Sequence, residues 1–266
     1  MVRPVTGPRA SLKIVDLDGD GEEEVVLRND RLYAVVSPVQ GGRLIYLFAR
    51  TPRGGALLVG NPTDDWNFQE ELNRYMDQPS NHPGALADVG FEHDRYRVSF
   101  VEVDSHALVE MTNVQEGSRL CGTTKGVLLP SDTPALVVGY CIPDTVDGLA
   151  IDSCLSPDYY RLLRRGRHVL SPITGERWRG CRNGDVAVWT GLADDEETSW
   201  EEPASLEVGH GFIVRTLARA PRFHLLIGYG EIDGELRRRL IESGREAMHG
   251  GGVSASTQNR TLRGLE

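Results

Sequence analysis

The chain has 266 residues, with 30 glycines, 14 prolines and a formal net charge of −10 at pH 7. The negative charge argues against nucleic acid as a partner, because phosphates would be repelled, and no apolar run approaches the roughly twenty residues that cross a bilayer. Glycines and prolines spread through the chain favour many short strands and turns. A chain of this length fits one all-β domain over residues 1–266.

We expect no export signal at the start of the sequence. Met1-Val2-Arg3-Pro4 is not followed by the apolar segment that signal peptides contain. Four cysteines, at 121, 141, 154 and 181, lie far apart without the spacing of a metal site, so we expect free buried thiols rather than disulfides. These features together predict a cytoplasmic protein.

In chain order, the first informative element is an acidic loop with glycines at residues 16–24. Its carboxylates alternate as in a loop that wraps Ca²⁺, an ion that takes about six to eight oxygen ligands. The expected ligands are the side chains of Asp16, Asp18, Asp20 and Glu24 and the backbone carbonyl of Glu22. The loop is not an EF-hand, because its twelfth position is Leu27 and a β-run follows. We predict a structural Ca²⁺ site in a β-hairpin loop; an Asp-Gly hairpin turn without an ion is the alternative.

The same region carries a resemblance to a known family. The matching stretches are Asp-x-Asp-Gly-Asp-Gly-x-Glu-Glu-Val at 16–25, Arg-Asn-Asp-Arg-Leu at 28–32 and Ser-Pro-x-x-Gly-Gly-Arg-Leu at 37–44. They resemble the opening of the C-terminal β-sandwich domain that follows the catalytic barrel in family 57 glycoside hydrolases, the amylases and 4-α-glucanotransferases. That domain belongs to the galactose-mutarotase-like group.

The resemblance implies a carbohydrate-processing context, with an oligosaccharide or α-glucan as ligand. It also implies a catalytic glycosidase barrel as partner in a parent protein, of which this chain would be an excised domain. It does not imply catalysis by this chain, because the nucleophile and the acid of those enzymes sit on the barrel.

Apolar runs between turn signals predict strands through most of the chain. The expected strands are 24–27, 32–37, 43–49, 96–103, 107–112, 122–129, 135–142, 185–190, 205–208, 211–217 and 223–230. A helix is expected over 233–249, with Asp233 as a candidate N-cap and with Leu236 and Leu240 four residues apart. Residues 66–76 fit a short helix or an ordered loop. The fold class is therefore all-β: an antiparallel two-sheet supersandwich with a short C-terminal helix.

The stretch 64–96 concentrates the residue types that hold sugars, because aromatic rings stack on sugar rings and polar side chains bind hydroxyls. We expect Trp66 and Tyr75 to be stacking platforms. The expected hydroxyl partners are Asn81, His82, Glu92, His93 and Arg95. The alternative is a loop packed over one sheet, whose charges form structural ion pairs.

Asn81-His82-Pro83 also resembles the Asn-His-x-Tyr-Phe stretch of galactose mutarotases, whose His binds substrate. Pro83-Gly84-Ala85 replaces the aromatic half of that stretch here. His82 and Glu92 are the candidates for acid/base chemistry if the chain has any.

Two function classes stay open. The first is a carbohydrate-associated, non-catalytic accessory domain of an α-glucan-active glycoside hydrolase or glucanotransferase. The second is a free-standing mutarotase-like, epimerase-like or other sugar-active enzyme on the same scaffold. The sequence leaves open whether the chain is an enzyme, because a fold does not determine a function.

Overall fold

Strands form two antiparallel sheets in the computed structural model, which describes residues 10–17, 19–51, 54–59, 84–103, 105–157, 170–193, 198–208 and 211–249. The first sheet has the strand order β1 (Ser11–Val15), β2 (Glu24–Arg28), β3 (Leu32–Ser37), β4 (Arg43–Thr51), β5 (Gly54–Val59), β11 (Leu149–Leu155), β16 (Gly211–Ala218) and β15 (Thr198–Val208), and β6 (Ala87–Asp88) pairs with β11. The second sheet has the order β12 (Ser171–Thr174), β13 (Trp178–Asn183), β14 (Val186–Leu192), β17 (Arg222–Tyr229), β10 (Ala135–Cys141), β9 (Thr124–Pro130), β8 (His106–Asn113) and β7 (Tyr96–Val103).

Buried side chains from both sheets form the core between them. Strand β8 shows how the strand period builds this core, because successive side chains point to opposite faces. Ala107, Val109 and Met111 belong to the core between the sheets, whereas Leu108 belongs to a second cluster on the outer face of the second sheet.

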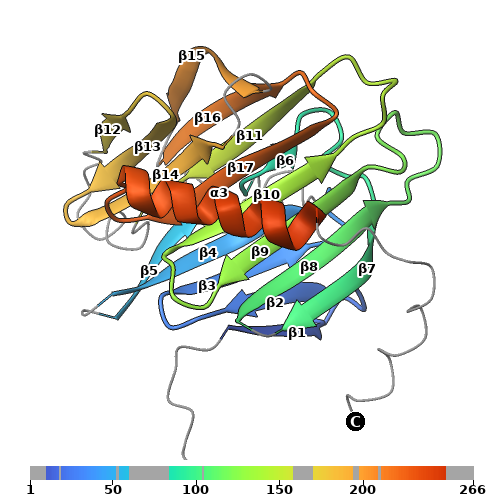
Figure 1. The fold of residues 1–266 in the computed structure, drawn as a ribbon, viewed down its shortest axis with the longest axis horizontal. Coiled ribbons are helices and arrows are strands. Elements are labelled where there is room, and N and C mark those ends of the chain that lie inside the picture. Colours follow the sequence, from blue (N-terminus) through green and yellow to red (C-terminus); the bar gives the residue numbers. More distant parts are fainter. Residues whose placement is uncertain are drawn as a thin grey trace, which may run out of the picture.

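The helix α3 (Gly234–His249) covers that outer face and lies across the strands of the second sheet (Figure 1). Its N-terminus is capped by Asp233, whose Oδ1 accepts a hydrogen bond from the Leu236 amide at 2.6 Å. Leu236 and Leu240 pack in one cluster with Val137 and Leu226 of the sheet. The expected helix, its N-cap and its apolar spacing are all confirmed.

Replacing Asp233 with Ala is expected to lower the free energy of unfolding by about 1 kcal/mol, because the Leu236 amide loses its capping partner. Chemical denaturation followed by circular dichroism measures the change. Asp233→Asn keeps an acceptor oxygen and is the matched control, which should stay close to the parent chain. An equal loss in both variants would show that the charge, rather than the cap, matters.

The all-β, two-sheet antiparallel supersandwich with a C-terminal helix is confirmed. The strands expected at 32–37 and 96–103 coincide with β3 and β7. The strand prediction was incomplete, however, since it missed β1, β5, β6, β11, β12 and β13. In β11 the apolar pattern is broken by Asp152, whose Oδ1 accepts a hydrogen bond from Arg215 Nε of β16 at 2.7 Å.

The expectation for the cysteines was half right. Cys154 and Cys181 are buried free thiols, but Cys121 and Cys141 are exposed. Cys121 lies in a turn before β9, and Cys141 is the last residue of β10, where the strand leaves the core. Within the described residues, no helix is long and apolar enough to cross a bilayer.

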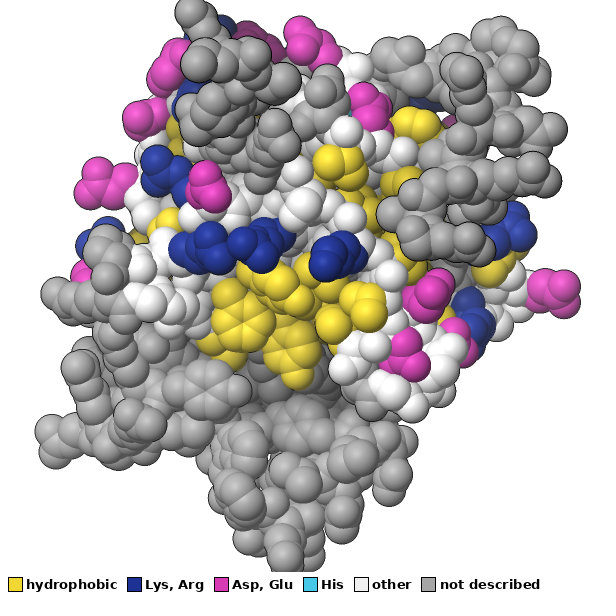
Figure 2. All heavy atoms as spheres, turned by 90° about the horizontal axis from the view of Figure 1, so that it is seen from below, with side chains coloured by type: hydrophobic (Ala, Val, Ile, Leu, Met, Phe, Trp, Pro, Cys, Tyr) yellow, Lys and Arg dark blue, Asp and Glu magenta, His cyan; other side chains and the backbone are white. Residues whose placement is uncertain are grey.

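Aromatic side chains line the outer side of β3 and β4. Tyr33 and Phe48 are cross-strand partners whose ring centroids lie 6.2 Å apart, and Tyr46 stacks on Phe48 at 5.9 Å. On the face seen from below, hydrophobic side chains gather beside a row of Lys and Arg side chains (Figure 2). Cross-strand aromatic pairs contribute about 0.2–1 kcal/mol each, so these rings help to fix the register of β3 and β4.

Candidate functional site

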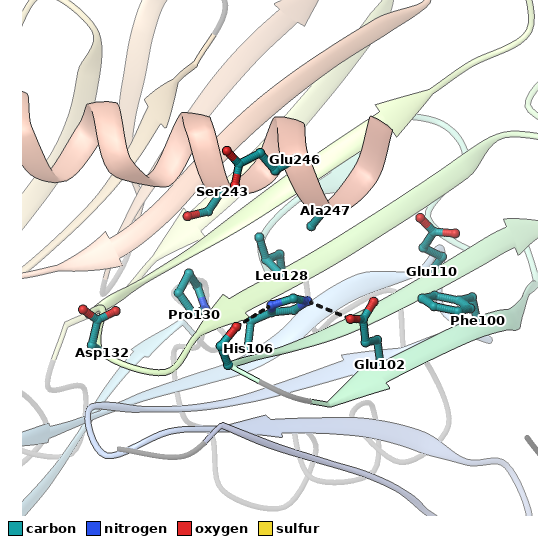
Figure 3. Close-up of a pocket in the computed structure, with 11 residues that line it drawn as sticks. Phe100, Glu102, His106, Glu110, Leu128, Pro130, Asp132, Ser243, Glu246 and Ala247 are labelled. Atoms are coloured by element: carbon teal, nitrogen blue, oxygen red, sulfur yellow. Dashed lines mark hydrogen bonds and ion pairs between the residues drawn. The ribbon is translucent and has the colours of Figure 1, made fainter. Parts of the chain in front are cut away.

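A pocket of about 630 Å³ lies between the C-terminal half of α3 and strands β7, β8 and β9 (Figure 3). Its lining residues are Phe100, Glu102, Ser105, His106, Glu110, Leu128, Pro130, Asp132, Ser243, Glu246 and Ala247. The pocket therefore joins the edge of the second sheet to the helix that covers that sheet. It combines an aromatic ring, an imidazole and several carboxylates.

A β-bulge aims Phe100 into the pocket. The pairing of β7 with β8 shifts register between Val98 and Phe100. Val98 and Val101 pack against the core between the sheets, whereas Phe100 is 45% exposed and lines the pocket. Without the extra residue, strict alternation would turn Phe100 to the same side as Val98. The bulge thus supplies an aromatic wall on the outer face of the sheet.

Polar side chains converge beside this ring. His106 Nε2 lies 3.8 Å from Glu102 Oε1, and His106 Nδ1 lies 3.4 Å from Ser105 Oγ (Figure 3). Glu110 stands directly opposite Phe100 in the β7–β8 register, and partial burial raises the pKa of its carboxyl group. An exposed ring with hydrogen-bonding groups around it is the composition of a site for a hydroxylated ligand.

The sequence did not predict this pocket. The local sequence signal is that these residues stand an even number of positions apart, as side chains on one face of a strand do. Phe100 and Glu102 are two residues apart, and His106 and Glu110 on the next strand are four residues apart. The bulge that turns Phe100 outward and the approach of α3 depend on the tertiary structure.

The acidic loop predicted to bind Ca²⁺ turns around Asp16. Its Oδ1 and Oδ2 accept hydrogen bonds from the backbone amides of Gly19 and Gly21, at 2.7 and 3.0 Å. Both glycines have positive φ angles, 81° and 88°, which glycine adopts without a steric penalty. At the end of the loop, the buried Glu24 accepts a hydrogen bond from the Leu17 amide at 3.1 Å through its Oε2. Asp16 and Glu24 thus hold the loop backbone.

The Ca²⁺ site itself stays a prediction, since Asp18 lies outside the described residues. Among the residues that are described, no three His, Cys, Asp or Glu side chains are placed to hold a metal. Asp20 Oδ1 accepts a hydrogen bond from the Glu22 amide at 2.8 Å. The Glu22 carboxylate pairs with Arg95 at 2.7 Å, which is compatible with the backbone carbonyl of Glu22 acting as the ligand.

Most of the predicted sugar-contacting residues lie outside the described residues: Trp66, Tyr75, Asn81 and His82. The structure describes the other three predicted residues, Glu92, His93 and Arg95. Glu92 accepts a hydrogen bond from the Gly90 amide at 2.9 Å within its own turn, and His93 is exposed. Arg95 is brought to the acidic loop by its ion pair with Glu22. A sugar surface on this segment, and any acid/base role for His82 and Glu92, stay predictions.

A buried ion pair between the sheets was also missed. Lys125 Nζ of β9 lies 2.8 Å from Asp88 Oδ2 of β6, and both side chains are fully buried. Lys125 also donates a hydrogen bond to the Gly41 carbonyl at 2.7 Å, and the rings of Tyr96 and Tyr140 flank its ammonium group at 5.0 and 5.1 Å. Burial raises the pKa of Asp88 and lowers that of Lys125, while the charge of each partner opposes the shift in the other. Because neither side chain is exposed, the pair ties the two sheets together rather than holding a ligand.

No protein-family model matches the chain, and no curated protein matches it. Among solved structures, it is similar to a 4-α-glucanotransferase from Thermococcus litoralis, with 13% identity and a TM-score of 0.41, over 85% of this chain and 40% of that chain. The chain thus spans less than half of that protein.

Two further structures have similar scores. The periplasmic domain of YidC from Thermotoga maritima has 11% identity and a TM-score of 0.43, over 90% of this chain and 96% of that chain. A TPR-domain containing protein from Parabacteroides distasonis has 10% identity and a TM-score of 0.44, over 92% of this chain and 50% of that chain. All three TM-scores lie below 0.5, so the similarity does not indicate a shared function.

Proposed function

We propose that the chain is a carbohydrate-binding β-sandwich, the non-catalytic accessory domain of an α-glucan-active glycoside hydrolase or glucanotransferase. In this proposal the pocket beneath α3 is its sugar site. The observation that carries the proposal is the exposed ring of Phe100, which the bulge turns into the pocket beside Glu102, His106 and Glu110. The sequence resemblance at residues 16–44 supports the same carbohydrate context.

The physical reason is the dual character of a sugar. Its C–H face packs on an aromatic ring, and its hydroxyl groups donate hydrogen bonds to carboxylates and imidazole. The volume of about 630 Å³ falls in the range of about 300–1,000 Å³ that is typical of small-ligand sites. Phe100 would be the stacking platform, and Glu102, His106 and Glu110 would bind hydroxyls.

Replacing Phe100 with Ala is expected to weaken oligosaccharide binding at least tenfold, a loss of about 1.4 kcal/mol. Because the side chain is 45% exposed, the variant should keep the melting temperature of the parent chain. Isothermal titration with maltotriose and longer maltooligosaccharides measures the effect.

Val114→Ala is the matched control, because Val114 is 39% exposed and does not line the pocket. Trp66→Ala tests the other predicted surface. If Trp66→Ala abolishes binding and Phe100→Ala does not, the sugar site lies on the segment 64–96 and the pocket assignment is wrong.

A second candidate is a free-standing mutarotase-like or epimerase-like enzyme. It is favoured by the presence of His106 and Glu110 in one pocket, where burial raises the pKa of Glu110 and keeps its carboxyl protonated to higher pH, as a general acid requires. NMR of the same sugars with the isolated chain tests it. Anomer exchange faster than in buffer, and lost in Glu110→Gln, would establish an enzyme.

We also propose that the loop 16–24 holds a structural Ca²⁺ ion through Asp16, Asp18, Asp20, Glu24 and the carbonyl of Glu22. All five are hard oxygen donors, which is the set that Ca²⁺ prefers. A catalytic glycosidase barrel in a parent protein is the proposed partner of the domain.

A further inference from the structure

The pocket beneath α3 carries more negative charge than a neutral sugar requires. Carboxylates of Glu102, Glu110, Asp132 and Glu246 line it, and His106 is the basic side chain among its described lining residues. Arg239 lies 3.5 Å from Asp132 and offsets that carboxylate in part. Because Glu102 Oε1 lies 3.8 Å from His106 Nε2, Glu110 and Glu246 are the lining carboxylates without an ion pair to another described residue.

The C-terminal end of α3 adds to the negative electrostatic potential of the pocket. The pocket contacts Ser243, Glu246 and Ala247, which belong to the last two turns of the helix. A helix carries a partial negative charge at its C-terminus, so a cation is favoured there. The Phe100 ring contributes in the same direction, because an aromatic face attracts a cationic group.

We infer that the pocket selects an amino sugar with a free ammonium group over the corresponding neutral sugar. The inference rests on the carbohydrate-binding part of the proposed function and goes beyond the rest of it, because the glucose units of an α-glucan carry no ammonium group and should bind more weakly. The sugar ring packs on Phe100, and the ammonium group donates hydrogen bonds to the carboxylates of Glu102 and Glu110. A bound ammonium ion also relieves the repulsion among the carboxylates.

Affinity for the amino sugar should depend on pH. Partial burial raises the pKa of Glu110, so its carboxyl is neutral over part of the acidic range. The groups that share the pocket with it are Glu102 of β7, His106 of β8, Asp132 after β9 and Glu246 of α3. An ammonium ion binds the charged carboxylate more tightly than the neutral acid. Affinity should therefore rise as the pH increases from acidic to neutral, up to the pH at which the amine loses its proton.

The test compares three β-1,4 disaccharides that differ in the group at C2 of each ring: the glucosamine disaccharide (amino), its N-acetylated form (acetamido) and cellobiose (hydroxyl). Isothermal titration of the folded chain at neutral pH is expected to show the glucosamine disaccharide binding about tenfold more tightly than the other two, which corresponds to one charge-assisted hydrogen bond. Glu110→Gln should remove most of this preference, because it weakens binding of the glucosamine disaccharide more than binding of cellobiose. Glu116→Gln, which removes an exposed carboxylate that does not line the pocket, should keep it.

Equal affinity for the three sugars would overturn the inference and leave the proposed carbohydrate function standing. Binding of 1,4-diaminobutane as tight as that of the glucosamine disaccharide would overturn the amino-sugar class, because the pocket would then recognise charge alone. Failure of all three sugars and of maltotriose to bind would overturn the inference and the proposed function together.

Discussion

Replacing Lys125 with Met is expected to lower the free energy of unfolding by about 3–5 kcal/mol, because it leaves the charge of Asp88 buried without a partner. Asp88 Oδ1 already has no hydrogen-bond partner, and its Oδ2 lies 2.8 Å from Lys125 Nζ. The variant also removes the donor to the Gly41 carbonyl. Urea denaturation of the variant and the parent chain measures the difference.

The double variant Lys125→Met/Asp88→Leu is the control for this prediction. Replacing both partners with apolar side chains removes the uncompensated charge, so much of the lost stability should return. Arg238→Met breaks an exposed ion pair with Glu235 and should change stability little. If Lys125→Met is as mild as Arg238→Met, the buried pair does not tie the sheets together.

Addition of Ca²⁺ is expected to raise the free energy of unfolding by about 2.7 kcal/mol when the free ion is about a hundredfold above Kd. The gain is expected because the proposed site in the loop 16–24 would hold the ion in the folded chain and not in the unfolded one. Thermal melts with Ca²⁺ and with EDTA measure it. Asp18→Ala should lower the melting temperature in Ca²⁺ and leave it unchanged in EDTA.

Asp30→Ala is the matched control for the loop, because Asp30 is an exposed aspartate outside residues 16–24. It should keep the full response to Ca²⁺. A melting curve of the parent chain that does not move on chelation would contradict the site and leave the Asp-Gly hairpin turn without an ion.

Local pattern predicted the elements whose apolar spacing is regular. Leu32–Ser37 and Tyr96–Val103 were located to the residue, and the helix with its Asp233 cap followed from capping and spacing. Leu149–Leu155 was missed because Asp152 interrupts its apolar run. The partner that makes this carboxylate compatible with a strand is Arg215, which is 63 residues away in the chain.

The same limit applies to the site. The acidic loop could be proposed as a Ca²⁺ site from the sequence because its residues are contiguous. The pocket could not be predicted, because the helix that carries Glu246 is far in the sequence from the neighbouring strands that carry Phe100 and Glu110. In addition, a single extra residue in β7 decides which way Phe100 points. The buried Lys125–Asp88 pair could not be predicted for a similar reason, because no local sequence pattern indicates that Lys125 pairs with Asp88.

The most direct test of the sugar pocket is a two-dimensional amide NMR titration of the folded chain with maltotriose and with the glucosamine disaccharide. The pocket assignment predicts that the amide signals of Phe100, His106, Glu110 and Ala247 shift together and saturate. Shifts confined to Glu92, His93 and Arg95, or no shift at all with either sugar, would contradict it.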